Sequence, residues 1–523
     1  LVIGVLVMCV ARRLGVGPWG GIVAALVVFL GVGLGFVGLF NDACTGHGYS
    51  AAQCTLSYVI GHPGEGAGVV FGTLHDIPST IAAQPRAYDG LPSDGGMPPL
   101  PGMQWYTPLM AWWLPQRTIA YGFAVALCVL LLVYAGLHAD RRSWTPFALA
   151  GGLIGVLPIV HIQTLFALAV ILLMIGLRHR RREWFALIPV ALVVAAPRLI
   201  QVAVAPHGAA TAGNAYPWLE PGWLANANAR IEPSALGALQ GVGTAITQLG
   251  SGSWWWFWFV NLGLVVPLVA VVLLLAAATV VRGRAALFAR SALRAVPSPV
   301  LELLLSATII FALCNVVVFQ SWDWDNTKLL VYWYLAVGIA VGALVSRAAR
   351  HAWRGIAAWC LVVSMLLTGV LVMLRFGPWT PVNDQVGGPY AIGDAQEVAL
   401  AATVASATPA HAVFLTFGRP NDPLLALGGR TAVMGYYGWL WSYGTVFGSR
   451  YSDEQAMYQG CSSGCDVVQL LRRYHIDFVE IDDRVNDAGA VTPTPDLRWW
   501  SQHGYPVIAR SDHIVVYDVR SAG

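Results

Sequence analysis

The sequence predicts an α-helical polytopic membrane protein with a small C-terminal extracytoplasmic α/β domain. Hydrophobic residues make up 57% of the 523 positions and charged residues only 11%, about half the charged fraction of a typical soluble protein. The mean hydropathy is +0.63. Long apolar runs alternate with short arginine-rich stretches, which indicates a chain that crosses a membrane several times.

We expect nine complete transmembrane spans and an N-terminal half span within the domain 1–376. A helix needs about 20 apolar residues to cross a bilayer, and the run 145–177 is long enough for two short spans that turn near Pro158. The expected segments are 1–11 (the half span), 18–40, 118–137, 145–177 (two spans), 184–205, 254–281, 301–319, 329–346 and 355–374.

The arginines predict the orientation, because loops rich in Lys and Arg stay on the cytoplasmic side of a membrane. We place four basic stretches in the cytoplasm: 12–13, 138–142 with 178–182, 282–294 and 347–354. We place on the outer side the loops 41–117, 207–253 and 320–328 and the domain 380–523. No basic stretch violates this alternation.

The C-terminal domain is predicted from short apolar strands that alternate with helices, a pattern typical of small α/β domains. The expected strands are 412–416, 478–481 and 514–518. The expected helices are 394–406, 453–459 and 466–474. Nothing in this domain is expected to be catalytic.

Cysteine spacing predicts disulfides in the segments placed outside the cytoplasm. Cys461 and Cys465 enclose three small residues, and Cys44 and Cys54 share the first outer loop. Disulfides form in exported domains, whereas a zinc site would need further ligands, and only His475 lies near the C-terminal pair. We therefore expect a Cys461–Cys465 disulfide and no metal-ligating residues there.

A polar stretch between two apolar runs is the first candidate site. It holds carboxylates, an amide and an ammonium beside two tryptophans: Trp322, Asp323, Trp324, Asp325, Asn326 and Lys328. Ionisable groups at a membrane boundary are costly and often mark a functional site. Asp323 and Asp325 share one face of an extended loop, and Lys328 supplies the compensating cation. The alternative is an interfacial hairpin whose tryptophans anchor the helix ends.

Other polar residues are expected at the same outer level. Gln116 and Arg117 precede a span, and His161 lies at the turn near Pro158. Such a set suits a general base with cations that hold a phosphate. Arg117 could instead be a snorkelling anchor and His161 a buried histidine at the kink, so these alternatives stay open.

Several motifs argue against other functions. The chain has no GxxxxGK[ST] phosphate loop and no GxSxG elbow, so neither nucleotide-driven transport nor a serine nucleophile is supported. The GxGxxG sequence at 33–38 lies in an apolar run, and we attribute it to helix packing through small residues. His75 and Asp76 are expected to be a hydrogen-bonded loop pair.

The many-span plan, the long outer loops and the outer α/β domain resemble the GT-C superfamily of polytopic glycosyltransferases, in particular a bacterial, actinobacterial-type group. The local motifs that carry this resemblance are Pro115-Gln116-Arg117 before a span, His161 after Leu157-Pro158, Asn261-Leu262-Gly263 with Pro267, Trp322-Asp323-Trp324-Asp325-Asn326-Thr327-Lys328, and Gly428-Gly429-Arg430 with Gly435-Tyr436-Tyr437-Gly438-Trp439.

The resemblance implies a hexosyl- or pentosyltransferase of the plasma (bacterial inner) membrane. It would move a sugar from a polyprenyl-phosphate-linked donor to a glycan, lipid or protein acceptor on the outer face, with no nucleic-acid partner. Asp323 and Asp325 are the expected catalytic carboxylates. The expected substrate- and phosphate-binding residues are Gln116, Arg117, His161, Trp322, Trp324, Asn326 and Lys328. A divalent metal cofactor is left open.

The start of the sequence bears on the catalytic role. In this superfamily the principal carboxylate usually lies in the first outer loop, and Leu1 stands inside an apolar run, so we expect the N-terminal part to be missing. Asp323 and Asp325 are then either the base or accessory to it. A transporter or flippase of a lipid-linked glycan and a non-catalytic membrane scaffold remain alternatives.

Overall fold

The computed structural model divides into two compact units. Unit 1 contains Leu1–Ala205 and Tyr216–Pro389, and unit 2 contains Tyr390–Gly523 with Pro206–Ala215. The structure describes residues 1–83, 87–90, 99–114, 116–204, 218–222, 235–279, 289, 293, 296–319, 323–348, 352–376, 394–416, 422–442, 447–461, 465–483 and 495–522.

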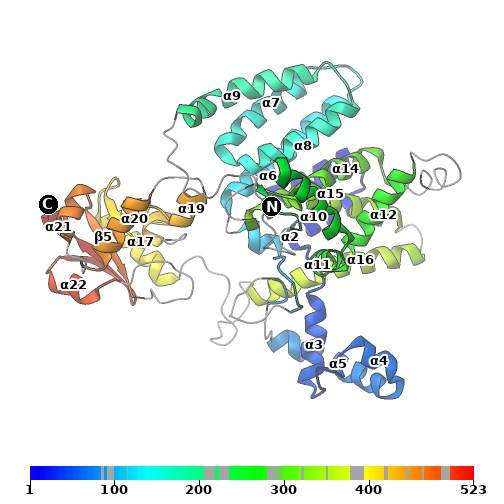
Figure 1. The fold of residues 1–523 in the computed structure, drawn as a ribbon, viewed down its shortest axis with the longest axis horizontal. Coiled ribbons are helices and arrows are strands. Elements are labelled where there is room, and N and C mark those ends of the chain that lie inside the picture. The colour runs from blue at the N-terminus through cyan, green and yellow to red at the C-terminus, as the bar shows by residue number, and fades with distance from the viewer. Residues whose placement is uncertain are drawn as a thin grey trace. The chain divides into compact units, whose positions relative to one another are not determined.

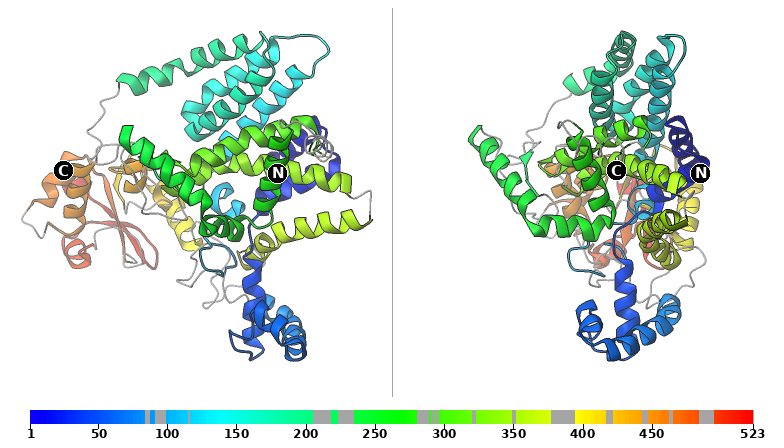
Figure 2. Two further views of the ribbon diagram at one scale, coloured as in Figure 1. Left: turned by 45° about the vertical axis from the view of Figure 1, so that its right-hand side comes forward. Right: turned by 90° about the vertical axis from the view of Figure 1, so that its right-hand side faces the viewer.

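Unit 1 is helical (Figure 1). Its main helices are α1 (Val2–Arg13), α2 (Pro18–Leu30), α3 (Phe36–Gly46), α4 (Leu56–Gly61), α5 (Pro63–Ala83), α6 (Arg117–Leu137), α7 (Thr145–Val160), α8 (Ile162–Arg178), α9 (Trp184–Val204), α10 (Ala235–Gly250), α11 (Gly252–Leu262), α12 (Val265–Ala278), α14 (Ser298–Cys314), α15 (Thr327–Ala348) and α16 (Ala352–Phe376). Figures 1 and 2 show α7, α8 and α9 as a layer beside α14 and α15.

Among the described residues, four helices are long and apolar enough to cross a membrane: Thr118–Leu137, Trp184–Gln201, Trp324–Ala348 and Ala352–Phe376. The count rises to five if α11 and α12 form one bent span. The remaining expected spans correspond to four shorter apolar helices, α2, α7, α8 and α14. Composition and length thus suggest a membrane protein, with fewer full-length spans than the nine expected.

Helix α15 is the packing centre of unit 1, and nearly all of its side chains are buried. It crosses α2 at two glycines: a Cβ on Gly20 would lie 2.3 Å from the Gly342 carbonyl oxygen, and one on Gly342 would lie 2.1 Å from that of Gly20. Only residues without a side chain allow backbones this close, as in other membrane helix pairs.

The expected span 18–40 is wrong, because α2 ends at Leu30 and α3 begins at Phe36. The GxGxxG sequence begins in the break between them rather than inside one helix. There the Leu34 amide donates to the Val260 carbonyl (2.9 Å), and Thr368 Oγ1 donates to the Gly33 carbonyl (2.9 Å). Neighbouring helices satisfy the backbone groups that the break leaves open, which makes a broken apolar segment tolerable.

The span expected at 254–281 is also broken. The chain bends by 117° between α11 and α12, and Gly263 between them has φ of 64°. A positive φ is readily adopted by glycine and strained for other residues, so Gly263 permits the sharp turn.

The three segments expected to be outer loops contain more regular structure than expected. Segment 41–117 carries most of α3, all of α4 and α5, and a short π-helix, η1 (Leu109–Trp113). Segment 207–253 carries α10 and a strand, β1 (Trp218–Leu219), which pairs antiparallel with β2 (Val317–Val318). Segment 320–328 carries a 3-10 turn, η2 (Asp323–Asn326).

Helix α5 shows why the first of these segments was mistaken for a loop. Its glycines and internal Pro78 disfavour a helix, but Pro63 lies at its start and Glu65 in its first turn. Proline is favoured at the first position of a helix, and an acidic side chain there complements the helix dipole. Burial of Val69 and Thr73 on one face adds tertiary stabilisation.

Unit 2 is a small mixed α/β domain, as expected. Its five-stranded sheet has the order β4-β3-β5-β7-β6, in which β3 is parallel to β4 and β5, and β7 is antiparallel to β5 and β6. The strands are β3 (Val413–Leu415), β4 (Thr431–Ala432), β5 (Phe478–Asp482), β6 (Val507–Arg510) and β7 (Ile514–Asp518).

The expected helices of unit 2 are present as α17 (Ala395–Ala407), α20 (Gly448–Tyr458) and α21 (Val467–Arg473), joined by α22 (Leu497–Gln502). Alternate strand residues point to opposite faces of the sheet. Phe414 and Phe478 therefore pack with α17, whereas Leu415 and Val479 pack with α20, α21 and α22. The expected disulfide between Cys461 and Cys465 is present.

Candidate functional site

The start of α15 carries an ion pair that is mostly buried. Lys328 Nζ lies 2.8 Å from Asp325 Oδ2, and the two side chains keep only 17% and 14% of their exposure. Charges desolvated to this extent are strongly dependent on each other, because removal of one leaves the other uncompensated. The pair therefore fixes one negative and one positive group at the beginning of a central helix.

A chain of hydrogen bonds joins α8 to the same part of α15. His161 Nδ1 lies 2.8 Å from Thr164 Oγ1, and the Thr164 hydroxyl is also hydrogen-bonded to the Tyr332 hydroxyl. Tyr332 follows Lys328 by four residues, so the two side chains lie on one face of α15. His161 is thereby held on the side of α15 that carries Lys328.

The first turns of α6 pack against this hydrogen-bonded chain. A Cβ on Gly122 would lie 2.5 Å from Thr164 Oγ1 and 2.7 Å from His161 Cβ, so only a glycine fits without movement. The Phe123 ring lies against Tyr332, with 5.5 Å between the ring centroids. The N-terminal parts of α6, α8 and α15 therefore meet at one place.

Two predicted residues, Gln116 and Arg117, lie at the start of α6. Gln116 is the residue that precedes the helix, and Arg117 is its first residue. Gly122 follows by less than two turns, so both residues begin close to the His161 contact. The side chain of Arg117 lies outside the described part of the structure. Helix N-termini bear partial positive charge, so their meeting point favours an anion.

Burial determines the charge of His161, which lies in the turn between α7 and α8. Desolvation, and second the nearby positive charge of Lys328, lower the pKa of its imidazole to about 4. The ring is neutral at pH 7 and offers one donor and one acceptor nitrogen. The remaining formal charges of the described cluster are those of Asp325 and Lys328.

Two other predicted residues, Asn326 and Trp324, contact neighbouring parts of unit 1. The buried Asn326 side chain donates to the Val317 carbonyl (2.7 Å) and accepts from the Phe319 amide (3.1 Å), so it closes the connection between α14 and α15. We assign it to positioning Asp325 rather than to contact with a ligand. The Trp324 ring lies 4.7 Å from that of Tyr106, centroid to centroid.

The side chains of two further predicted residues are not described by the structure. Trp322 and the side chain of Asp323 lie outside the described part, although the Asp323 backbone begins η2. Their roles stay predictions. Sequence reasoning missed Tyr332, because it stands in an apolar run where a tyrosine is expected only to pack. Its spacing of four residues from Lys328 was the available signal.

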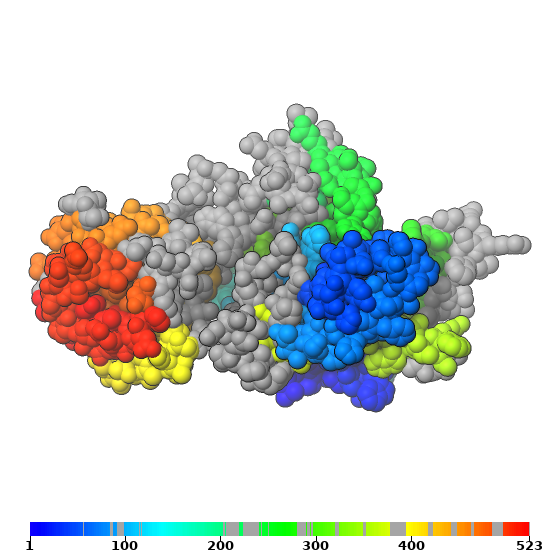
Figure 3. Space-filling view, turned by 90° about the horizontal axis from the view of Figure 1, so that it is seen from below, coloured from blue at the N-terminus to red at the C-terminus, as the bar shows by residue number. Residues whose placement is uncertain are grey.

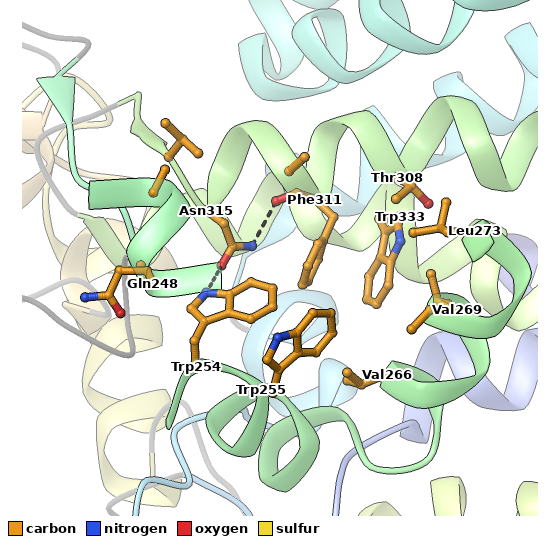
Figure 4. A pocket seen from close by; sticks show the side chains of 15 residues that line it. Gln248, Trp254, Trp255, Val266, Val269, Leu273, Thr308, Phe311, Asn315 and Trp333 are labelled. Atoms are coloured by element: carbon orange, nitrogen blue, oxygen red, sulfur yellow. Dashed lines mark hydrogen bonds between the residues drawn. The ribbon is translucent and has the colours of Figure 1, made fainter. Parts of the chain in front are cut away.

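An apolar pocket lies between α10, α11, α12 and α14, and Trp333 of α15 reaches its wall (Figure 4). Its volume is about 240 Å³, and its wall includes Trp254, Trp255, Phe311 and Trp333, the last being the neighbour of Tyr332. The Asn315 amide on this wall accepts from Trp254 Nε1 (3.2 Å) and donates to the Phe311 carbonyl (2.9 Å). Because most of the wall is formed by aromatic and aliphatic side chains, the pocket suits an apolar occupant.

The arrangement combines three capacities. Asp325 can accept a proton, Lys328 and the helix N-termini can stabilise an anion, and His161 can exchange hydrogen bonds without carrying charge. No protein-family model matches the chain, and no curated protein matches it either. The function is therefore inferred from the residues of the cluster.

Proposed function

We propose that the chain is a membrane glycosyltransferase of the GT-C type. It transfers a sugar from a polyprenyl-phosphate-linked donor to an acceptor hydroxyl on the outer face of the membrane. The observation that carries the proposal is the mostly buried Asp325–Lys328 pair at the point where the first turns of α6, α8 and α15 meet. A carboxylate and an anion-stabilising environment are the two elements that such a transfer requires.

The proposed reaction is a single displacement with inversion. Asp325, assisted by Asp323 in the same turn, removes the proton of the acceptor hydroxyl, and the oxygen attacks the anomeric carbon of the sugar. The bond from that carbon to the phosphate oxygen breaks, and its electron pair stays with the departing polyprenyl phosphate. Lys328 and Arg117 stabilise that phosphate, so no strong general acid is needed.

The apolar pocket supports a donor with an isoprenoid chain. Trp333 in its wall directly follows Tyr332, so the pocket and the polar cluster use the same helix. A lipid-linked donor has a polar reacting group and a long apolar tail, and the polar cluster and the pocket suit these two parts. The tail is bound by burial of apolar area, at about 0.8 kcal/mol for each buried CH₂ group.

The cysteines support the proposed sidedness. Cys44 pairs with Cys54 in unit 1, and Cys461 pairs with Cys465 in unit 2, and both pairs lie in segments that the arginines assign to the outer side. Disulfides persist in oxidising, extracytoplasmic compartments. Among the described residues, the free cysteines are Cys9, Cys128, Cys314 and Cys360, each within a helix of unit 1.

A transporter or flippase of a lipid-linked glycan is the second candidate. The observation that favours it is the sharp break between α11 and α12, because discontinuous apolar helices line the substrate sites of many transporters. A transporter would move the lipid-linked glycan across the bilayer and leave its glycosidic bond intact. The two candidates therefore differ in whether a new glycosidic bond is made.

The test uses the full-length protein in proteoliposomes with a panel of radiolabelled polyprenyl-phosphate sugars and membrane-derived acceptors. We expect Asp325→Asn to lower the transfer rate at least about 100-fold, the usual contribution of a catalytic base. The matched control is Asp140→Asn, a change at an exposed carboxylate just beyond the other end of α6. Full activity of Asp325→Asn, or lipid translocation without product, would remove the proposal.

A further inference from the structure

Helices α3, α4 and α5 carry a second polar cluster, at a different place in unit 1. The three helices lie together at one end of the unit (Figures 1 and 2). In Figure 3 the surface of this segment faces the viewer. The cluster consists of His47, which caps the end of α3, and of His75 and Asp76 in α5.

The carboxylate of Asp76 joins the two imidazoles. Its Oδ2 lies 2.9 Å from His47 Nδ1, and its Oδ1 lies 2.7 Å from His75 Nδ1. One ligand atom from each of the three residues lies within 4.8 Å of the other two. Since metal–nitrogen and metal–oxygen bonds of Zn²⁺ measure about 2.0–2.2 Å, an ion between such atoms needs only small side-chain movements.

The chain fixes His47 in this position by covalent and steric means. The disulfide between Cys44 and Cys54 encloses His47 in a short loop. Its ring lies against the backbone of α5, because a Cβ on Gly72 would come within 2.6 Å of His47 Cδ2. Tyr49 stacks on the ring as well, with 5.3 Å between the ring centroids. A ligand held in this way loses little conformational entropy when a metal binds.

We propose that His47, His75 and Asp76 bind a divalent transition-metal ion of the zinc class. Two imidazoles and one carboxylate are a ligand set that suits Zn²⁺, and three protein ligands leave a fourth position open to water or to another ligand. The bound ion replaces the imidazole protons that now bridge to Asp76. It thereby links the end of α3 to α5. This site is independent of the proposed sugar transfer.

Solvent access agrees with reversible binding. The side chain of His75 keeps 82% of its exposure and that of His47 keeps 37%, so an ion can enter without opening the fold. The alternative is a metal-free clamp in which Asp76 only accepts hydrogen bonds from the two rings. The two arrangements use the same residues, and direct metal titration distinguishes them.

The experiment titrates the purified full chain in detergent, after removal of any polyhistidine tag and of bound metal, with ZnCl₂ by calorimetry and with CoCl₂ by visible absorption. We expect one ion per chain. His47→Ala and Asp76→Asn should each weaken binding about tenfold or more, since each removes a ligand. His62→Ala, which removes a nearby exposed histidine that stacks on Tyr58, is the matched control and should bind as the unchanged chain does.

The intact Cys44–Cys54 disulfide and an unchanged gel-filtration profile show that each variant is folded. The conservative His75→Gln variant gives a second, independent test. No binding of either metal by the unchanged chain overturns the proposal, as does binding that His47→Ala, His75→Gln and Asp76→Asn all leave unaltered.

Discussion

Asp325 and Asp76 are both carboxylates held by nitrogen partners, but the partners of Asp76 are much more exposed than that of Asp325. The Asp325–Lys328 pair is mostly buried at the start of the central helix α15. The Asp76 cluster lies on a surface segment, and its partner His75 is largely exposed. Both clusters join elements that are distant in sequence. They differ in how easily water reaches them.

This difference determines what each cluster can do. Desolvation strengthens the mutual attraction of Asp325 and Lys328 and makes each dependent on the other, so the pair provides a fixed electrostatic environment for a reaction. Exposure weakens the contacts of Asp76 with His47 and His75, so protons there can exchange for a metal ion. We infer that the first cluster is suited to catalysis and the second to reversible binding.

The largest expected contrast is in stability. Lys328→Met leaves the carboxylate of Asp325 unpaired, and we expect a loss of about 3–4 kcal/mol in the free energy of unfolding. Asp76→Asn breaks contacts to histidines that water reaches and should cost much less stability than Lys328→Met does. Unfolding in mixed detergent measures both. The double variant Asp325→Asn/Lys328→Met should recover part of the stability that Lys328→Met loses. Equal losses of stability in Lys328→Met and Asp76→Asn would contradict the comparison.

The second contrast is in pH dependence. The pKa of His161 lies near 4 in the folded state, below the ordinary value, so the unfolded chain binds more protons between about pH 6.5 and pH 4. Stability should therefore fall by roughly 2–3 kcal/mol as the pH falls through this window. His161→Gln should abolish this contribution to the loss of stability at low pH. His47→Gln, measured with a metal chelator present, should retain it, and the same profile for both variants would refute the assignment.

The smallest contrast concerns two glycines. Gly122→Ala places a methyl group against Thr164 and His161, and we expect a loss of about 1–2 kcal/mol in stability. Gly64→Ala in α5 meets nothing within 4 Å and should be neutral or stabilising by up to about 1 kcal/mol. Thermal unfolding in detergent tests the pair. A harmless Gly122→Ala would mean that α6 does not pack tightly on the cluster.

Local signals made much of unit 2 predictable from the sequence, although strands β4 and β6 and helix α22 were not expected. Helix α17 begins with a capping box, in which Asp394 accepts from the Glu397 amide and the Glu397 side chain accepts from the Asp394 amide. Such a box is visible as two residues at a fixed spacing. Strands β3, β5 and β7 are short apolar runs between polar segments, and each was expected within about two residues of its bounds.

Unit 1 was harder to predict because its decisive contacts are not local. The break after Leu30 depends on hydrogen-bond partners in α11 and α16, more than 200 residues away. His75 and Asp76 were expected to form an isolated pair, because the third member, His47, is separated from Asp76 by 29 positions. The polar stretch before α15 was found because charges beside apolar runs are conspicuous, whereas Tyr332 gave no such signal.

The central claim is that the cluster at the start of α15 is the transfer site, and one assay tests it directly. It compares the transfer rates of the full-length protein, Asp325→Asn and Asp76→Asn with one polyprenyl-phosphate sugar under identical conditions. We predict that Asp325→Asn loses at least about 100-fold while Asp76→Asn keeps the rate of the unchanged protein. An active Asp325→Asn together with an inactive Asp76→Asn would contradict the account and place the chemistry at α5.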